Sequence, residues 1–192
     1  MSLISSFRAL WSLLIDNQKA ATVNKQQKDL LSKPNHESPR PGPFHPHVLI
    51  STWFCSGLLP KAPGTWGSLA ALPFAWFIVS QWGYTGLAIG VVLVFILGWW
   101  SSSAYVMLTG SEDPGEVVID EVAGQWIVLL AAPLDPIAYA GAFLLFRLFD
   151  ILKPWPVSFA DKSIKGGLGI MLDDVLAGIY GAAILALVLE FF

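Results

Sequence analysis

Acidic side chains stand at the ends of several strongly apolar segments of this chain. Five carboxylates share this position: Asp120, Glu121, Asp150, Asp173 and Asp174. The first pair opens an apolar segment at 116–132, and Asp150 lies near the end of the next one, at 137–152. The last pair opens the final apolar segment, 173–192. Carboxylates at the edges of apolar helices are suited to bind a cation or to move protons.

The breaks between these segments indicate that the five carboxylates converge. A helical hairpin that turns at Pro133-Leu134-Asp135-Pro136 brings Glu121 and Asp150 to one level, and the polar, glycine-rich loop 153–172 returns the last pair to that level. Each charge near hydrocarbon is unfavourable by about 3 kcal/mol, and the group would also repel itself. A divalent cation among the carboxylates would relieve the repulsion.

The available ligands favour a hard cation. Oxygen ligands without nearby His or Cys select Mg²⁺ or Mn²⁺ before Zn²⁺. The three histidines (His36, His45 and His47) all lie upstream, and Cys55 is the only cysteine. A structural alternative remains open: Asp173 and Asp174 at a helix start are favoured by the helix dipole and could be simple caps.

Basic residues near the acids suit a phosphate group. Arg147 and Lys153 flank Asp150, at i, i+3 and i+6, which also fits a set of intrahelical ion pairs. Lys61 precedes the loop Gly64-Thr65-Trp66-Gly67-Ser68, where Thr65 and free backbone N–H groups at a helix start could form an anion cradle. A second flexible loop is expected at 166–169, Gly-Gly-Leu-Gly.

The residues that several other phosphatase mechanisms require are missing from this sequence. Cys55 has no Arg six positions later, no Asp-x-Asp opens a strand–helix unit, and no His lies among the candidate site residues. Water activated by a metal, or a carboxylate nucleophile, remains.

The composition indicates the surroundings of such a site. Apolar residues make up 55% of the 192-residue chain and charged residues 13%, about half the charge of a soluble domain. The net charge of −3 and the lack of a basic stripe argue against nucleic-acid binding. The sequence therefore predicts a membrane protein.

The apolar pattern predicts an all-α, polytopic helical bundle with about four to five membrane-embedded helices. A polar, proline-rich tail at 1–47, with a short amphipathic helix at 1–17, precedes a membrane-embedded domain at 48–192. Residues 48–59 are too short to span. The expected helices are Trp66–Trp82, turning at Gly83, then Gly86–Leu108, Glu116–Ala132, Ile137–Leu152 and Asp173–Phe192. The third and fourth are short and could dip into one leaflet.

The distribution of positive charge supports this topology. All eleven Lys and Arg residues fall on or near the side that holds the N-terminal tail, and the opposite turns near Gly83 and Leu134 contain none. The positive-inside rule identifies the charged side as cytoplasmic. The carboxylates would lie on that same side.

Four ordered motifs resemble the phosphatidylglycerophosphatase A family. They are APGTWGSL at 62–69, VIDEVAG at 118–124, FRLFDILKPWP at 146–156 and GLGIMLDDVLAG at 167–178. The resemblance covers 48–192 and implies a Mg²⁺-dependent inner-membrane enzyme of phospholipid synthesis. It would remove the terminal phosphate of phosphatidylglycerophosphate and yield phosphatidylglycerol.

The resemblance also suggests roles for the residues above. The five carboxylates would hold one or two Mg²⁺ ions, and Arg147 and Lys153 would neutralise the substrate phosphate, with Thr65 and Lys61 as further phosphate-binding candidates. Glu121 is the first choice to accept the proton of the attacking water. The alternatives are a transporter or ion pathway, a structural membrane protein, and an enzyme acting on a related phospholipid.

Overall fold

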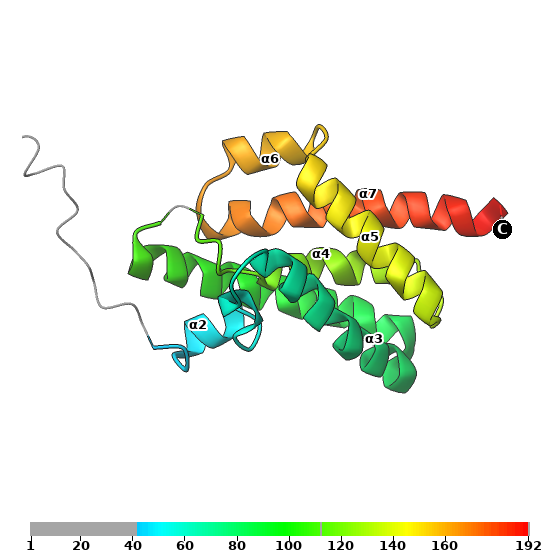
Figure 1. Ribbon diagram of the computed structural model, residues 1–192, viewed down its shortest axis with the longest axis horizontal. Coiled ribbons are helices and arrows are strands. Elements are labelled where there is room, and N and C mark those ends of the chain that lie inside the picture. Colours follow the sequence, from blue (N-terminus) through cyan, green and yellow to red (C-terminus); the bar gives the residue numbers. More distant parts are fainter. Residues whose placement is uncertain (1–41, 112, 192) are drawn as a thin grey trace, which may run out of the picture. The chain divides into compact units, whose positions relative to one another are not determined.

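The computed structural model describes residues 42–111 and 113–191, and within them every regular element is a helix, as the sequence predicts. The predicted helix at 1–17 and nearly all of the predicted tail lie outside the described residues. The elements are α2 (Pro46–Ser51), η1 (Ser56–Leu58), α3 (Pro63–Thr109), α4 (Ile119–Leu129), α5 (Pro136–Leu152), α6 (Val157–Ser163) and α7 (Gly166–Phe191) (Figure 1).

Helix α3 is a hairpin of two apolar arms. Its backbone leaves the helical region at Gly83, with φ 66° and ψ −169°, a combination that is open essentially to glycine alone. The predicted turn at this residue is confirmed. At the turn, the Tyr84 hydroxyl donates a hydrogen bond of 2.8 Å to the carbonyl of Ala132, so the Gly83 turn lies beside the connection between α4 and α5.

Two described helices, α3 and α7, are long and apolar enough to cross a membrane. Only 28% and 33% of their most apolar windows are buried, so most of their apolar side chains face outward. A core helix of a soluble protein would be mostly buried, and these outward faces match helices in contact with lipid. The chain is thus suited to associate with a membrane.

Helix α4 lies at the centre of the described part and packs against α3, α5 and α7. Most of its eleven residues are buried, and the Trp126 indole N–H donates to the carbonyl of Ala71 in α3 at 2.9 Å. It begins at Ile119, later than the expected Glu116, because the Val117 N–H closes a turn on the carbonyl of Pro114 and the Val118 N–H donates to the carbonyl of Ser51 in α2. This helix fixes the depth of its first-turn acids.

The start of α7 corrects one prediction. The helix begins at Gly166, not at Asp173, so the expected loop at 166–169 is helical, and α6 occupies part of the expected loop 153–172. A Cβ atom on Gly167 would collide with Ser103, and one on Gly169 would collide with the carbonyl of Ile164. These glycines serve close packing of a helix. Asp173 and Asp174 consequently lie two turns inside α7, and the helix-cap interpretation of them is wrong.

Candidate active site

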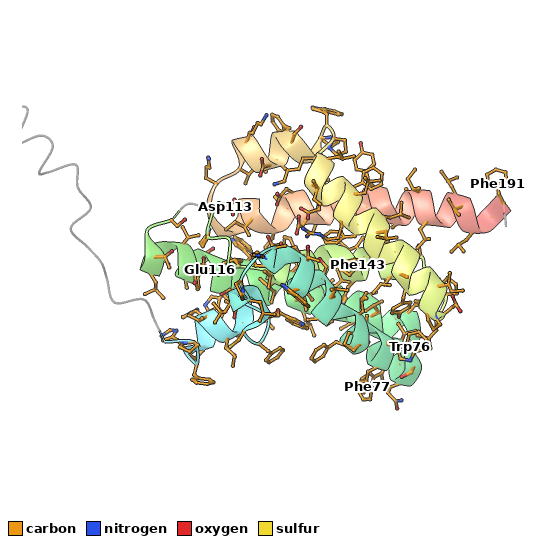
Figure 2. The ribbon with its side chains drawn as sticks, viewed as in Figure 1. Trp76, Phe77, Asp113, Glu116, Phe143 and Phe191 are labelled. Carbon is orange, nitrogen blue, oxygen red and sulfur yellow. The ribbon has the colours of Figure 1, made fainter. Side chains whose placement is uncertain are left out.

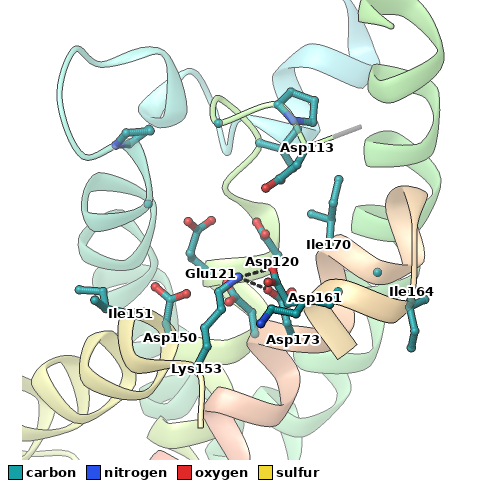
Figure 3. Close-up of a pocket in the computed structure, with 18 of the residues that line it drawn as sticks. Asp113, Asp120, Glu121, Asp150, Ile151, Lys153, Asp161, Ile164, Ile170 and Asp173 are labelled. Atoms are coloured by element: carbon teal, nitrogen blue, oxygen red, sulfur yellow. Dashed lines mark hydrogen bonds and ion pairs between the residues drawn. The ribbon is translucent and has the colours of Figure 1, made fainter. Parts of the chain in front are cut away.

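All five predicted carboxylates line one cavity of about 690 Å³ (Figure 3). They come from three elements: the first turn of α4, the last turn of α5 and the third turn of α7. The turn at Pro133–Pro136 does return α5 toward the start of α4, where the Asp135 carboxylate caps α5 by accepting from the N–H groups of Ile137 and Ala138 at 2.9 Å. The cavity is large enough for a phosphorylated headgroup.

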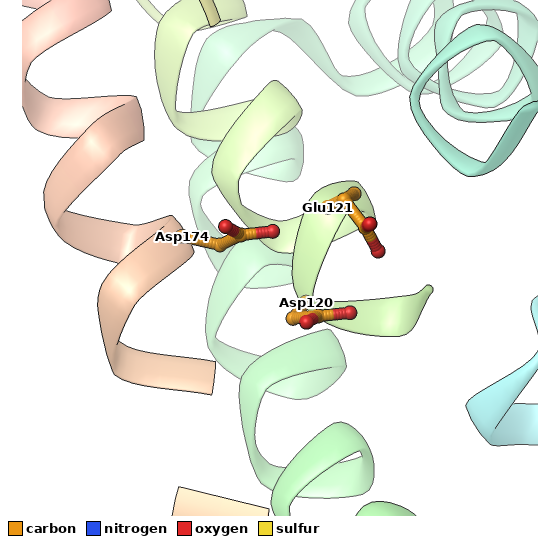
Figure 4. Close-up of side chains that lie close together, drawn as sticks. All are labelled: Asp120, Glu121 and Asp174. Carbon is orange, nitrogen blue, oxygen red and sulfur yellow. The ribbon is translucent and has the colours of Figure 1, made fainter. Parts of the chain in front are cut away.

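Three of the carboxylates form the tightest group. One oxygen each of Asp120, Glu121 and Asp174 lies within 4.8 Å of the other two (Figure 4). Each residue also has a buried oxygen with no hydrogen-bond partner: Oδ1 of Asp120, Oε2 of Glu121 and Oδ2 of Asp174. Asp174 is buried and the other two acids are half-buried, so three carboxylates with unpartnered buried oxygens would repel one another unless a cation sits among them. The all-oxygen donor set fits a hard divalent ion such as Mg²⁺. This group is called the acid triad below.

Glycine contacts between α4 and α7 set the spacing of the acid triad. A Cβ atom on Gly178 would approach the carbonyl oxygen of Gly124 to 2.5 Å, and one on Gly124 would approach the carbonyl oxygen of Asp174 to 2.6 Å. Both distances are too short for real contacts, so only glycine permits this approach of the two backbones. Asp174 is thereby brought to the first turn of α4.

Arg147 neutralises one edge of the triad. Its Nη1 lies 2.6 Å from Oδ2 of Asp150 and 3.9 Å from Oε1 of Glu121. The i, i+3 ion pair expected from the sequence is therefore present between Arg147 and Asp150. This pair also offsets the unfavourable position of Asp150 near the C-terminus of α5.

Lys153 makes a different set of contacts from the one expected. Its amine bonds Oδ1 of Asp161 at 2.6 Å and Oδ2 of Asp173 at 2.7 Å, instead of Asp150. Lys153 caps α5 in a left-handed conformation, φ 42°, which turns the chain away from the helix direction. Burial alone would lower the pKa of Lys153, but the hydrogen bonds to Asp161 and Asp173 outweigh it and raise the pKa above its ordinary value. The amine keeps a third N–H donor for a ligand.

Two predicted phosphate-binding residues do not reach the cavity. Lys61 and Thr65 are absent from its lining, which contains Ala62 and Gly64 from the same loop. The expected cradle of free N–H groups is also wrong in part, because the N–H groups of Thr65 and Trp66 donate to the carbonyl of Ala62. The start of α3 contributes Ala62, Pro63 and Gly64 to the lining of the cavity.

The sequence reasoning missed Asp161, and it named Gly64 only as part of an anion cradle and not as a neighbour of Glu121. A Cβ atom on Gly64 would collide with Oε1 of Glu121 and lie 3.0 Å from Nη1 of Arg147, so this glycine makes room for the pair. The proline before it, at the first helical position, marked a helix start where backbone could approach a ligand. Asp161 gave no comparable signal in the sequence, because its contact with Lys153, eight residues earlier, depends on the fold of α6.

The fold and the cavity define a helical, membrane-associated protein whose acids and bases suit phosphate chemistry. The chain belongs to the phosphatidylglycerophosphatase A family, since the family model matches residues 49–189. It is therefore a phosphatase, as the resemblance of the four motifs indicates.

The names of similar proteins agree with this assignment. Phosphatidylglycerophosphatase A of Escherichia coli K12 is 39% identical over 142 residues, 73% of this chain and 82% of that protein. The Haemophilus influenzae protein of the same name is 42% identical over 142 residues, and the match covers 87% of that protein. A protein of Bacteroides thetaiotaomicron, provisionally named a phosphatidylinositol-3-phosphatase, is 43% identical over 152 residues and covered to 91%. No solved structure matches the chain.

Proposed function

We propose that this protein hydrolyses the terminal phosphate of phosphatidylglycerophosphate in a Mg²⁺-dependent reaction, yielding phosphatidylglycerol for phospholipid synthesis. The names of its Escherichia coli and Haemophilus influenzae relatives support this substrate. The observation that carries the proposal is the acid triad with its unpartnered buried oxygens beside Arg147 and Lys153. Such a site combines a place for a divalent cation with positive charge for a phosphate.

In the proposed mechanism the carboxylates and the basic residues have different tasks, and Glu121 has two. Asp120, Glu121 and Asp174 would hold Mg²⁺, with Asp150 and Asp173 at the edge of the site. The bound ion would supply Lewis-acid stabilisation of charge on the phosphate oxygens. Arg147 and the third N–H of Lys153 would bind the phosphate, and Glu121 would accept the proton of the attacking water.

The cavity and the two turns support a multi-pass topology with the site at the cytoplasmic face of the inner membrane. The Gly83 turn and the α4–α5 connection lie together, joined by the hydrogen bond from Tyr84 to Ala132. The cavity lies at the opposite ends of these helices, at the starts of α3 and α4 and the end of α5. Four basic residues line the cavity (Arg147, Lys153, Lys162 and Lys165) and neither turn contains any. We propose that the two arms of α3 together with α4, α5 and α7 form the four to five membrane-embedded helices.

Labelling with a membrane-impermeant maleimide tests this topology. In a Cys55→Ser background, Leu134→Cys should react from outside spheroplasts, and Lys162→Cys should react only after lysis. Reaction of Lys162→Cys in sealed spheroplasts would contradict the proposed orientation and indicate the opposite one.

A substrate and metal panel tests the activity. Purified protein is offered phosphatidylglycerophosphate, phosphatidic acid, phosphatidylinositol 3-phosphate and a soluble phosphomonoester, each with Mg²⁺ and with EDTA. The proposal expects phosphate release from the first lipid, lost in EDTA and restored by Mg²⁺. Preference for the inositol lipid would favour the second candidate function, to which the name of the Bacteroides relative points.

Variants of the acid triad test the site. Glu121→Gln and Asp174→Asn keep the shape of each side chain and should lose at least about a hundredfold in activity, because several kcal/mol of metal-assisted stabilisation are removed. Glu190→Gln, near the far end of α7, is the matched control and should behave as wild type. Activity within about threefold of wild type in both triad variants would contradict the assignment.

A further inference from the structure

An apolar groove of about 500 Å³ lies between the first arm of α3 and helix α5, and two of its lining residues, Trp76 and Phe143, are labelled in Figure 2. On α3 it is lined by four residues from Leu69 to Trp76, and on α5 by four residues from Pro136 to Phe143. On both helices these residues stand at i, i+3, i+4 and i+7, so each helix contributes one continuous face. Among the lining residues, the Tyr139 hydroxyl and the Trp76 indole N–H are the only polar side-chain groups.

The groove and the cavity lie on the same face of α5. Continuing from Phe143, the i+4 and i+7 positions are Arg147 and Asp150, and both line the cavity. At 1.5 Å per residue, Phe143 lies about 10 Å and Pro136 about 21 Å along the helix from Asp150. A ligand lying along this face would contact charged groups at one end and apolar groups at the other.

Along the first arm of α3, the groove begins at a similar axial distance from the cavity. Gly64 lines the cavity, and the groove begins at Leu69, about 8 Å further along the helix, and reaches Trp76 at about 18 Å. The far end is closed where the rings of Trp76 and Tyr139 meet at 5.1 Å. Both walls therefore leave a similar interval between the cavity and the groove, and that interval can accommodate the glycerol and phosphodiester groups of a lipid headgroup.

We propose that the groove receives an acyl chain of the lipid whose phosphate occupies the cavity. This inference rests on the proposed function. A single molecule with a charged headgroup and an attached chain satisfies both regions at the observed separation. A helix of a second copy or a bulk lipid would have no reason to align with Arg147 and Asp150.

The groove acts by orientation rather than by hydrophobic affinity. Lipid tails are as apolar as the groove, so moving a chain from the bilayer into it gains little free energy. A chain held along α5 does, however, restrict the headgroup to the mouth of the cavity, and such positioning has large effects on rate. Blocking the groove should therefore slow the reaction of long-chain lipids and spare a substrate whose chains are too short to enter.

The experiment compares Ala140→Trp, which fills the groove, with Leu144→Trp, which adds the same ring on an outward-facing position of α5 outside the lining. Substrates are dioleoyl and dihexanoyl phosphatidylglycerophosphate in detergent micelles. Ala140→Trp should lower kcat/KM for the dioleoyl lipid about tenfold and change that for the dihexanoyl lipid by less than about twofold. Leu144→Trp should leave both values near wild type. Leu72→Trp repeats the test from the α3 wall.

The outcomes separate this inference from the proposed function. If wild-type protein hydrolyses neither lipid, the proposed function fails. If it hydrolyses both, and neither Ala140→Trp nor Leu72→Trp changes the ratio of the two kcat/KM values, the groove does not receive the chain. A uniform loss for both lipids leaves the ratio unchanged and also overturns the inference. A change in oligomer size on Ala140→Trp, measured by light scattering, would assign the groove to a second copy instead.

Discussion

The substitution Gly64→Ala adds one methyl group at the edge of the acid triad. The new Cβ atom would collide with Oε1 of Glu121 and lie 3.0 Å from Nη1 of Arg147, whereas ordinary contact begins at 3.4 Å. Because Gly64 lies in the first turn of α3 and does not have a positive φ, alanine suits the helix there. The perturbation thus falls on the Glu121 carboxylate, which must move by about 1 Å or more.

A displacement of this size predicts a large loss of activity with the fold retained. Misplacing a catalytic group by about 1 Å lowers the rate by about a hundredfold, or about 2.7 kcal/mol in transition-state free energy. Phosphate release from phosphatidylglycerophosphate in mixed micelles, measured over a range of Mg²⁺ concentrations, is the assay. The matched control is Gly141→Ala in α5, where a Cβ atom meets nothing within 4 Å. It should keep wild-type activity and gain about 0.5–1 kcal/mol in stability.

A second substitution separates a steric effect on Glu121 from a general disturbance. Glu121→Asp shortens the acid by one methylene and withdraws its carboxylate from Gly64. The double variant Gly64→Ala/Glu121→Asp should be more active than additivity of the two single losses allows. Strict additivity, or activity of Gly64→Ala within about threefold of wild type, would refute the claim that this glycine sets the position of Glu121.

Three further outcomes follow from the structure. Gly83→Ala should lower the free energy of unfolding by about 1–3 kcal/mol, because the φ and ψ angles of Gly83 are strained for any other residue. Unfolding in detergent measures this, and an unchanged unfolding midpoint would contradict the prediction. At a hundredfold excess over Kd, Mg²⁺ should raise the free energy of unfolding of wild-type protein by about 2.7 kcal/mol and so raise its unfolding midpoint, but it should not raise the midpoint of Asp174→Asn. Equal shifts in the two proteins would place the ion elsewhere. The pKa of Lys153 is higher in the folded state than in the unfolded state. Its ion pairs therefore stabilise the folded state fully at pH values below the unfolded-state pKa of about 10.4, and this stabilisation is lost as the pH rises through the folded-state pKa. The difference in midpoint between wild type and Lys153→Met should therefore stay constant from about pH 7 to 10 and shrink only above, and an earlier decline would refute the assignment.

The turns and the convergence of the acids could be predicted because they depend on local signals. Gly83 interrupts an otherwise uncharged apolar stretch, and the prolines at 133 and 136 end one helix and begin the next. Once those turns are fixed, helix length alone brings Asp150 to the level of Glu121. The roles of these residues, including the identity of the metal, stay predictions.

The start of α7 could not be predicted from the same signals. Three glycines within four residues at 166–169 are typical of a loop, yet Gly167 and Gly169 permit close contact with Ser103 and Ile164. That contact belongs to the tertiary structure and leaves no trace in local propensity. The position of Asp161 also depends on tertiary packing, since α6 packs against α7.

The same glycine contacts explain why an acid triad can exist inside an apolar bundle. Mutual repulsion of Asp120, Glu121 and Asp174 opposes the approach of α4 and α7, and no ion pair to Asp120 or Asp174 is present in the described part of the chain to reduce it. The backbones are held together by the packing of Gly124 against Gly178 and by the burial of α4 among three helices. The bundle therefore fixes three carboxylates at a spacing they would not adopt alone, so a divalent cation would meet ligands that need little rearrangement.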